Sequence, residues 1–307
     1  MRIGRTALIV AAAGTAALAF VFAGEAPLPV QTLEVPGAPF EIQCRSLQPG
    51  EPILVRLKAD APAGPIRVRL GLEAIVLSKP VADNPGRSFA LLGIDLGTKP
   101  GPLEIVVEVE NPDRTIAATL FVLQVAARDF PTREFRIATS MVTPPSEQTE
   151  RIRRESEMVA AILAVVSPEW LAKGSFQSPL PDFEPFPNFG QRRVYNKKVG
   201  SVHSGVDISA PRDTPALAPN DGRIVLASKL YFSGNTVVID HGLGVFTYGC
   251  HFDELLVRRG DMVAKGQAVA KVGSTGRSTG PHLHWSVRIL GARIDPYALL
   301  SLPLRES

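Results

Sequence analysis

The chain has 307 residues, of which 45% are apolar and 21% charged, so it can bury a sizeable core and favours two domains over one. Its 33 basic and 30 acidic side chains nearly balance, and its one basic cluster, RIRRES, lies among glutamates. Because no basic run is interleaved with aromatic residues, the sequence argues against nucleic-acid binding.

The first 23 residues have the layout of an export signal. Arg2 and Arg5 precede an uncharged run from Thr6 to Gly24. Basic residues followed by such a run are typical of a secretory signal, here with cleavage after Ala23. The run is also close to the roughly 18 to 20 residues needed to span a bilayer. Residues 1–23 are therefore either a signal peptide or an N-terminal membrane anchor, and we expect the rest of the chain to be exported to the periplasm or cell envelope.

Residues 27–126 have a β pattern. Short alternating or β-branched runs such as PILVRLKA, PIRVRLG and LEIVVEVE are separated by turns such as APAGP and DNPGRS. This spacing predicts an immunoglobulin-like β-sandwich. The segment contains no histidine and no polar cluster suited to chemistry, so we expect a spacer or a docking module for a regulatory partner.

Residues 144–186 predict a helix followed by a linker. Ser146 is placed to cap the helix, and KGSFQSPLPDFEPFPNFGQRR is dense in proline and phenylalanine. We expect this second segment to lie extended over the following domain, where it can wall a groove. The apolar side of the helix is predicted to carry Ile152, Val159, Ile162, Leu163 and Val166.

Residues 187–300 are predicted to form a second, all-β domain, with turn signals at NDG, FSGN, HGLG, RRGD and AKGQ. All histidines of the chain lie in this domain. They are His203, His241, His251, His282 and His284.

The stretch GPHLHWSV places two histidines one residue apart. If its apolar side chains face the core, a strand directs His282 and His284 together to the opposite face. VHSGVDIS adds His203 and Asp207, and TYGCHFDEL adds His251. A catalytic zinc site needs three nitrogen or oxygen ligands and an open position for water. These residues supply three ligands and two further imidazoles for proton transfer or oxyanion stabilisation, but the spacing leaves open which of the paired histidines binds metal.

Two other features have simpler interpretations. His241, in IDHGLG, is interpreted as a turn residue that makes a local hydrogen bond. Cys44 and Cys250 lie far apart in sequence. An exported chain permits a disulfide between them, and two buried free thiols are equally compatible with the sequence.

The runs HSGVDISAPRDTPALAPNDGRIV, NTVVIDHGLGVFTYGCH and VRRGDMVAKGQAVAKVGSTGRSTGPHLHWSV resemble the lysostaphin-type (LytM-domain) zinc metallopeptidases. Members of that family are endopeptidases that cut peptide bridges in bacterial peptidoglycan. The resemblance covers about residues 187–297, and the upstream β-rich module with FGQRRVYN is similar to exported multidomain members. It implies a mainly β protein with a C-terminal LytM-type peptidase domain, one Zn²⁺ ion and peptidoglycan as substrate.

The same resemblance assigns roles to individual residues. It implies His203, Asp207 and His284 as zinc ligands, and His251 and His282 as catalytic residues. The sequence departs from the family pattern at three positions without removing a ligand, so we expect these departures to change the substrate groove and the support of the site. They are Gly249, Phe252 and Ser286.

Two alternatives belong to other functional classes. A non-catalytic relative would bind and activate another cell-wall hydrolase, but such proteins have lost metal ligands, which this chain retains. VRRGDMVAKGQAVAKVG is similar to a lipoyl- or biotinyl-type carrier half-domain, but Lys265 and Lys271 lack the flanking residues of a carrier hairpin. The carrier interpretation would also leave the histidines unexplained.

Overall fold

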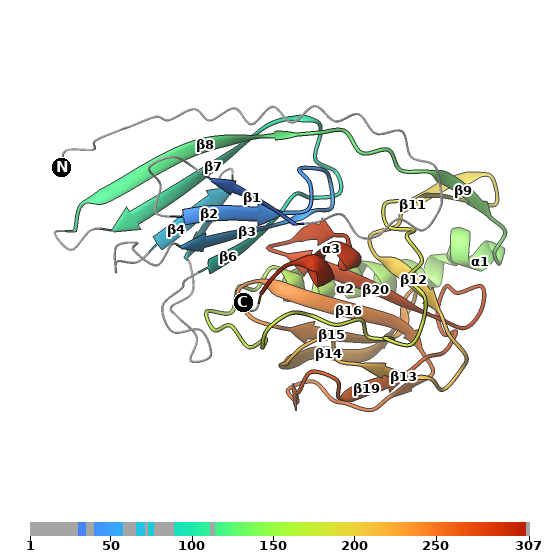
Figure 1. The fold of residues 1–307 in the computed structure, drawn as a ribbon. Coiled ribbons are helices and arrows are strands. Elements are labelled where there is room, and N and C mark those ends of the chain that lie inside the picture. The colour runs from blue at the N-terminus through green and yellow to red at the C-terminus, as the bar shows by residue number, and fades with distance from the viewer. Residues whose placement is uncertain are drawn as a thin grey trace.

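The computed structural model describes residues 30–34, 40–57, 66–70, 73–76, 89–110 and 114–304. Two β-rich units are joined by a short helical segment, which confirms a mainly β fold (Figure 1). The predicted signal or anchor over residues 1–23 lies outside the described residues. Within the described part of the chain, no helix combines the length and the apolar character needed to cross a membrane.

The N-terminal unit consists of two four-stranded antiparallel sheets that enclose one core. The rings of Phe40 and Phe121, one from each sheet, lie 5.4 Å apart in this core. Alternating burial along β2 follows from the period of two in a strand. The first sheet contains β1 (Gln31–Glu34), β2 (Phe40–Cys44), β3 (Pro52–Leu57) and β6 (Phe89–Gly93), and the second contains β5 (Glu73–Val76), β4 (Ile66–Leu70), β7 (Gly101–Glu110) and β8 (Ile116–Val125).

The helical segment comprises α1 (Thr139–Val142) and α2 (Ser146–Leu163). The predicted cap by Ser146 is wrong: the helix begins at this serine, and Pro145 occupies the N-cap without a side-chain hydrogen bond. Val166 is also not on the apolar side, because α2 ends at Leu163 and Val166 is 51% exposed. The predicted apolar residues that do pack against the C-terminal sheet are Val159, Ile162 and Leu163.

The linker after α2 has no regular element over residues 164–191 and runs along the C-terminal unit, as predicted. Phe176, Leu180 and Phe189 are at most 5% exposed and belong to the core of that unit. Backbone hydrogen bonds hold the linker against the C-terminal unit; for example, the Gln177 N–H donates to the Pro219 carbonyl over 3.0 Å. The linker is therefore part of the folded C-terminal unit.

A seven-stranded sheet forms the centre of the C-terminal unit, with strand order β12-β20-β16-β15-β14-β18 and β21 paired with β20. One face packs against the linker and a three-stranded sheet, β13-β19-β17, and the other face packs against α2. The elements are β12 (Val206–Ser209), β13 (Pro215–Leu217), β14 (Gly222–Leu230), β15 (Gly234–Asp240), β16 (Val245–Phe252), β17 (Glu254–Leu255), β18 (Met262–Val263), β19 (Ala268–Lys271), β20 (His282–Ile289), β21 (Ala292–Ile294) and α3 (Pro296–Ser301).

A further sheet connects the two units. It contains β9 (Thr132–Phe135), β10 (Arg192–Tyr195) and β11 (Lys198–Val202), in the order β11-β10-β9. β9 follows the last strand of the N-terminal unit and pairs in parallel with β10, which leads into the histidine-rich part of the chain. This sheet therefore ties the N-terminal unit to the segment that precedes the candidate site.

The two units pack directly on each other. The Arg293 guanidinium lies 2.6 Å from the Asp95 carboxylate, and Arg128 pairs with Asp295 at 2.9 Å. Gly93 permits the close approach of β6 to β21, because a Cβ there would lie 2.6 Å from the Ile294 side chain. These polar and apolar contacts fix the N-terminal unit against the edge of the C-terminal sheet.

Both cysteines are buried free thiols, so the second of the two sequence alternatives is correct. Cys44 lies in the core of the N-terminal unit and Cys250 lies on β16. Burial raises the pKa of each thiol to about 12.

Candidate metal centre

Two paired strands bring a carboxylate and an imidazole together. β12 runs antiparallel to β20, and Asp207 lies directly opposite His284 in their register. Residues paired in this way point to the same face of a sheet. The Asp207 Oδ1 and the His284 Nδ1 are 2.9 Å apart.

His203 reaches the same point from the loop before β12. Its Nε2 lies 3.1 Å from the Asp207 Oδ1 and 2.9 Å from the His284 Nδ1. Gly205 allows this approach, because a Cβ there would lie 2.4 Å from the Trp285 carbonyl oxygen. One possible ligand atom from each of His203, Asp207 and His284 lies within 4.8 Å of the others. The structure thus brings together the three residues predicted to bind metal.

His282 lies beside this cluster on the same face of β20. Its Nδ1 is 2.8 Å from the Gly280 carbonyl, and its Nε2 is 3.8 Å from the Asp207 Oδ1. Because the Nδ1 faces the Gly280 carbonyl, the Nε2 is the ring nitrogen directed at the cluster. The alternating side chains of β20 face the core and are at most 1% exposed, as predicted: Leu283, Trp285 and Val287.

His251 reaches the cluster through an irregularity in its strand. The β15–β16 register shifts so that Cys250 and His251 together oppose Thr236, and His251 has a φ of 66°. Such a bulge redirects a side chain at the cost of backbone strain of order 1–3 kcal/mol. The His251 Nδ1 donates to the Thr275 carbonyl over 2.8 Å, and its ring centroid lies 4.8 Å from that of His282. The structure therefore places both predicted catalytic histidines next to the predicted ligands.

The surroundings favour neutral rings at His251 and His284 and an ionised carboxylate at Asp207. Burial, followed by the charges of His282 and His284, lowers the pKa of His251 to about 3. Burial also lowers the pKa of His284 to about 4. Burial alone would raise the pKa of Asp207, but its hydrogen-bonding contacts with the rings of His203 and His284 hold that pKa well below its usual range. Neutral imidazole is the form that binds a metal or accepts a proton.

The linker and β10 support the cluster through two residues that the sequence analysis missed. Asn188 accepts the Asp207 backbone N–H at its Oδ1 over 3.0 Å, and its carbonyl accepts the His203 Nδ1 proton over 2.9 Å. Arg193 forms an ion pair with the Asp207 Oδ2. For Arg193 the signal was the similarity of FGQRRVYN to family members. Asn188 lies just before that motif, and residue spacing does not show where the linker folds back.

These donors match the chemistry of a catalytic zinc site. Two imidazole nitrogens and one carboxylate oxygen are a known three-ligand set for zinc, and they leave a fourth position open. His203 is fixed by a hydrogen bond on its other ring nitrogen, as metal-binding histidines usually are. The residues present therefore fit a metal ion, and zinc is the ion that this donor set suits.

His241 does not belong to this cluster. Its Nδ1 donates to the Asp221 carbonyl over 2.7 Å, and its Nε2 accepts from the Thr247 hydroxyl over 2.8 Å. The ring is completely buried, and burial lowers its pKa to about 4. His241 is therefore a structural residue outside the cluster, as predicted, but its hydrogen bonds are not local, because Asp221 lies 20 positions away in the sequence.

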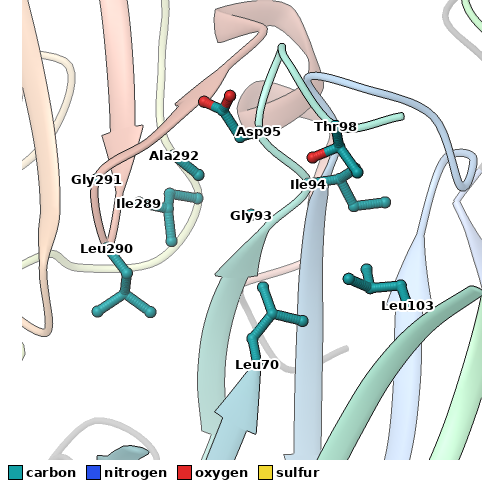
Figure 2. Close-up of a pocket in the computed structure, with 10 residues that line it drawn as sticks. All are labelled: Leu70, Gly93, Ile94, Asp95, Thr98, Leu103, Ile289, Leu290, Gly291 and Ala292. Atoms are coloured by element: carbon teal, nitrogen blue, oxygen red, sulfur yellow. The ribbon is translucent and has the colours of Figure 1, made fainter. Parts of the chain in front are cut away.

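A cavity of about 290 Å³ lies elsewhere, between the N-terminal unit and the β20–β21 turn (Figure 2). Its walls are mostly apolar, and the carboxylate of Asp95 at its edge is held by Arg293. This interface cavity contains no group suited to hydrolysis, so the histidine cluster remains the candidate site.

Comparison with known proteins agrees with this geometry. Residues 201–296 match the model of Peptidase family M23. Peptidoglycan DD-endopeptidase ShyB of Vibrio cholerae serotype O1 is 36% identical over 105 residues, which are 34% of this chain and 24% of that protein. DD-carboxypeptidase/endopeptidase Mpg of Neisseria meningitidis serogroup B is 39% identical over 118 residues, 38% of this chain and 27% of that protein. The chain thus matches about a quarter of the length of these curated relatives.

One solved structure extends the likeness beyond the matched segment. A crystal structure from Pseudomonas aeruginosa, described as a candidate peptidase M23, is 28% identical with a TM-score of 0.62. The match covers 83% of this chain and 96% of that chain. Because residues 201–296 are a much smaller share of the chain, the shared architecture includes the upstream β-sheets.

Proposed function

We propose that this chain is a zinc-dependent endopeptidase of peptidase family M23, with an additional N-terminal region, and that it hydrolyses peptide cross-links of bacterial peptidoglycan; the match of residues 201–296 to that family's model supports this. The observation that carries the proposal is the convergence of His203, Asp207 and His284 within 4.8 Å beside two further imidazoles. The relatives' names, peptidoglycan DD-endopeptidase and DD-carboxypeptidase/endopeptidase, support the substrate class.

We assign the metal to the His203 Nε2, the Asp207 Oδ1 and the His284 Nδ1, the atoms that face one another in the cluster. When bound, a zinc ion supplies Lewis-acid chemistry that polarises a peptide carbonyl and acidifies water. The single carboxylate compensates part of the dication's charge, and the Asn188 side chain holds the backbone of Asp207 in place.

The two remaining histidines handle the proton and the developing oxyanion. His251 and His282 each donate an Nδ1 proton to a backbone carbonyl, so each presents its Nε2 toward the space beside the ligands. In that position one ring accepts the proton from the attacking water and returns it to the leaving amine. The other ring takes up a proton from solvent at its Nε2 and then donates a hydrogen bond from this atom to the oxyanion.

The N-terminal unit is proposed to be an immunoglobulin-like module. In an assignment that takes β2 as strand A, the sheet β2-β3-β6 has the order A-B-E, and β1 is added at its edge. The sheet β5-β4-β7-β8 then has the order C′-C-F-G. We further propose the division into residues 1–23 (signal or anchor), 27–126 (module), 144–186 (helix and linker) and 187–300 (peptidase). Export to the periplasm or envelope, and a regulatory partner of the module, belong to the same proposal.

Digestion of purified sacculi tests the function. The zinc-loaded chain alone should open cross-links and release soluble glycan strands that carry peptides, a chelator should stop the release, and added zinc should restore it. Asp207→Ala should lose both zinc and activity, whereas His241→Gln should keep both. Because no second hydrolase is present, a protein that only activates another enzyme would release nothing, and that result would refute the endopeptidase assignment.

A further inference from the structure

The loop between β19 and β20 holds both proton-handling histidines. The Thr275 carbonyl accepts the His251 Nδ1 proton, and the Gly280 carbonyl accepts that of His282. Arg277 lies in the middle of this loop, and its backbone N–H donates to the Phe232 carbonyl over 2.7 Å. Arg277 is therefore attached to the same short segment that positions the two histidines.

The side chain of Arg277 is held by aromatic rings. Its guanidinium carbon is 4.6 Å from the ring centroid of Phe232 and 5.0 Å from that of Tyr195. Among the ion pairs of the described residues, none includes Arg277, whereas Arg193 and Arg212 each bind an aspartate. Contacts with aromatic rings stabilise the positive charge of a guanidinium but use none of its five N–H donors.

The two rings come from segments that support different parts of the site. Tyr195 is two residues after Arg193, whose guanidinium binds Asp207. Phe232 immediately precedes Ser233, whose carbonyl accepts the His251 backbone N–H over 2.9 Å. The guanidinium of Arg277 thus contacts one ring from the strand that supports a metal ligand and one ring from the turn that supports a catalytic histidine.

We infer that Arg277 is a substrate-binding residue that recognises a free carboxylate beside the cleaved amide of the cross-link. The inference rests on the proposed function. A guanidinium fixed by its contacts with rings is pre-oriented for two parallel hydrogen bonds to a carboxylate, which is the strongest pairing available to arginine. A cross-link formed between two D-configured centres carries such a carboxylate on the residue that supplies the amine, so amidation of that group should weaken recognition.

The test uses two synthetic cross-linked peptides that differ only in this group, one with the free carboxylate and one with the primary amide. The zinc-loaded full chain should prefer the acid about tenfold to a hundredfold in kcat/KM, mainly through KM. Arg277→Gln should lose this preference, because it should slow cleavage of the peptide with the free carboxylate and leave cleavage of the amide peptide unchanged. Arg277→Lys should keep part of the preference, since it retains the charge but not the paired donors.

Arg259→Gln, which removes an exposed arginine from another loop, is the matched control and should behave as the wild type. Zinc content is measured on every preparation. If Arg277→Gln fails to fold, the preference measured with Arg277→Lys decides. The inference is overturned if the Arg277 variants keep the wild-type ratio of kcat/KM for the acid and amide peptides, including the case in which both values change equally. That outcome does not contradict the proposed endopeptidase function. If the zinc-loaded wild type cuts neither peptide nor sacculi, the proposed function fails and the inference fails with it.

Discussion

Asp207 and His284 face each other across β12 and β20, with the Asp207 Oδ1 2.9 Å from the His284 Nδ1. His282, two residues earlier on β20, has its Nε2 3.8 Å from the same oxygen. The paired histidines of PHLH therefore differ in position: one contacts the carboxylate directly, and the other lies beside it.

Alanine substitutions should separate these two histidines. His284→Ala removes one of three proposed metal ligands, so zinc occupancy at limiting metal should collapse together with activity. His282→Ala should keep the zinc and lose roughly 10²- to 10⁴-fold in turnover, the usual effect of removing a positioned acid-base group. Zinc content and the release of soluble glycan strands are measured on the same preparations. Loss of zinc from His282→Ala with retention in His284→Ala would reverse the assignment.

Replacing His251 with asparagine should separate the catalytic role of its ring from the effect of its backbone conformation. Its φ of 66° is tolerated by asparagine better than by most residues, so His251→Asn should preserve the bulge of β16. We expect zinc to be retained, the melting temperature to change little, and turnover to fall roughly 10²- to 10⁴-fold. His251→Ala should show the same loss of turnover with additional destabilisation of about 1 kcal/mol. Full activity of His251→Asn would remove this residue from the mechanism.

The sequence predicted the parts of the site that depend on local periodicity. The alternation of HLHWSV placed His282 and His284 on one face, opposite the buried Leu283 and Trp285. The assignment of ligands within PHLH came only from family resemblance, since a strand directs both histidines to the same side.

Other features depend on long-range folding and could not be read from local patterns. Asn188 contacts Asp207 because the linker folds back along the C-terminal unit, and a Pro-rich segment has no period that shows such a path. The bulge that redirects His251 appears only in the pairing of β15 with β16. The end of α2 was missed because Val166 continues the apolar period although the helix has already ended.

Asn188 should be a positioning residue for metal binding. Its side chain accepts the Asp207 backbone N–H, and its amide lies 3.4 Å from the Asp207 Oδ2. Asn188→Ala should therefore weaken zinc binding about 10- to 100-fold, the usual range for groups that orient a ligand. Competition with a chelator measures the affinity, and the visible spectrum of the cobalt-loaded protein reports the ligand geometry.

Asn220→Ala is the matched control for Asn188→Ala. Asn220 is a fully buried asparagine that binds linker backbone at Lys173 and Gly174, away from the metal ligands. Its loss should lower the free energy of unfolding without changing zinc affinity or the cobalt spectrum. Equal effects of the two substitutions on zinc affinity would mean that Asn188 acts only through general stability.

His241 should make stability depend on pH. Its pKa is lowered to about 4 by burial, from an ordinary value of 6.5. The unfolded chain therefore takes up a proton near pH 6.5, while the folded chain stays neutral at this position until about pH 4. The contribution to stability is complete well above pH 6.5 and is lost as the pH falls toward 4, by about 1.6 kcal/mol between pH 6.5 and 5. His241→Gln removes this titration, so its free energy of unfolding should fall less over that interval.

Urea unfolding of both metal-free proteins measures the difference, in which the other four histidines cancel. Parallel pH profiles of wild type and variant would show that the buried ring does not titrate in this way.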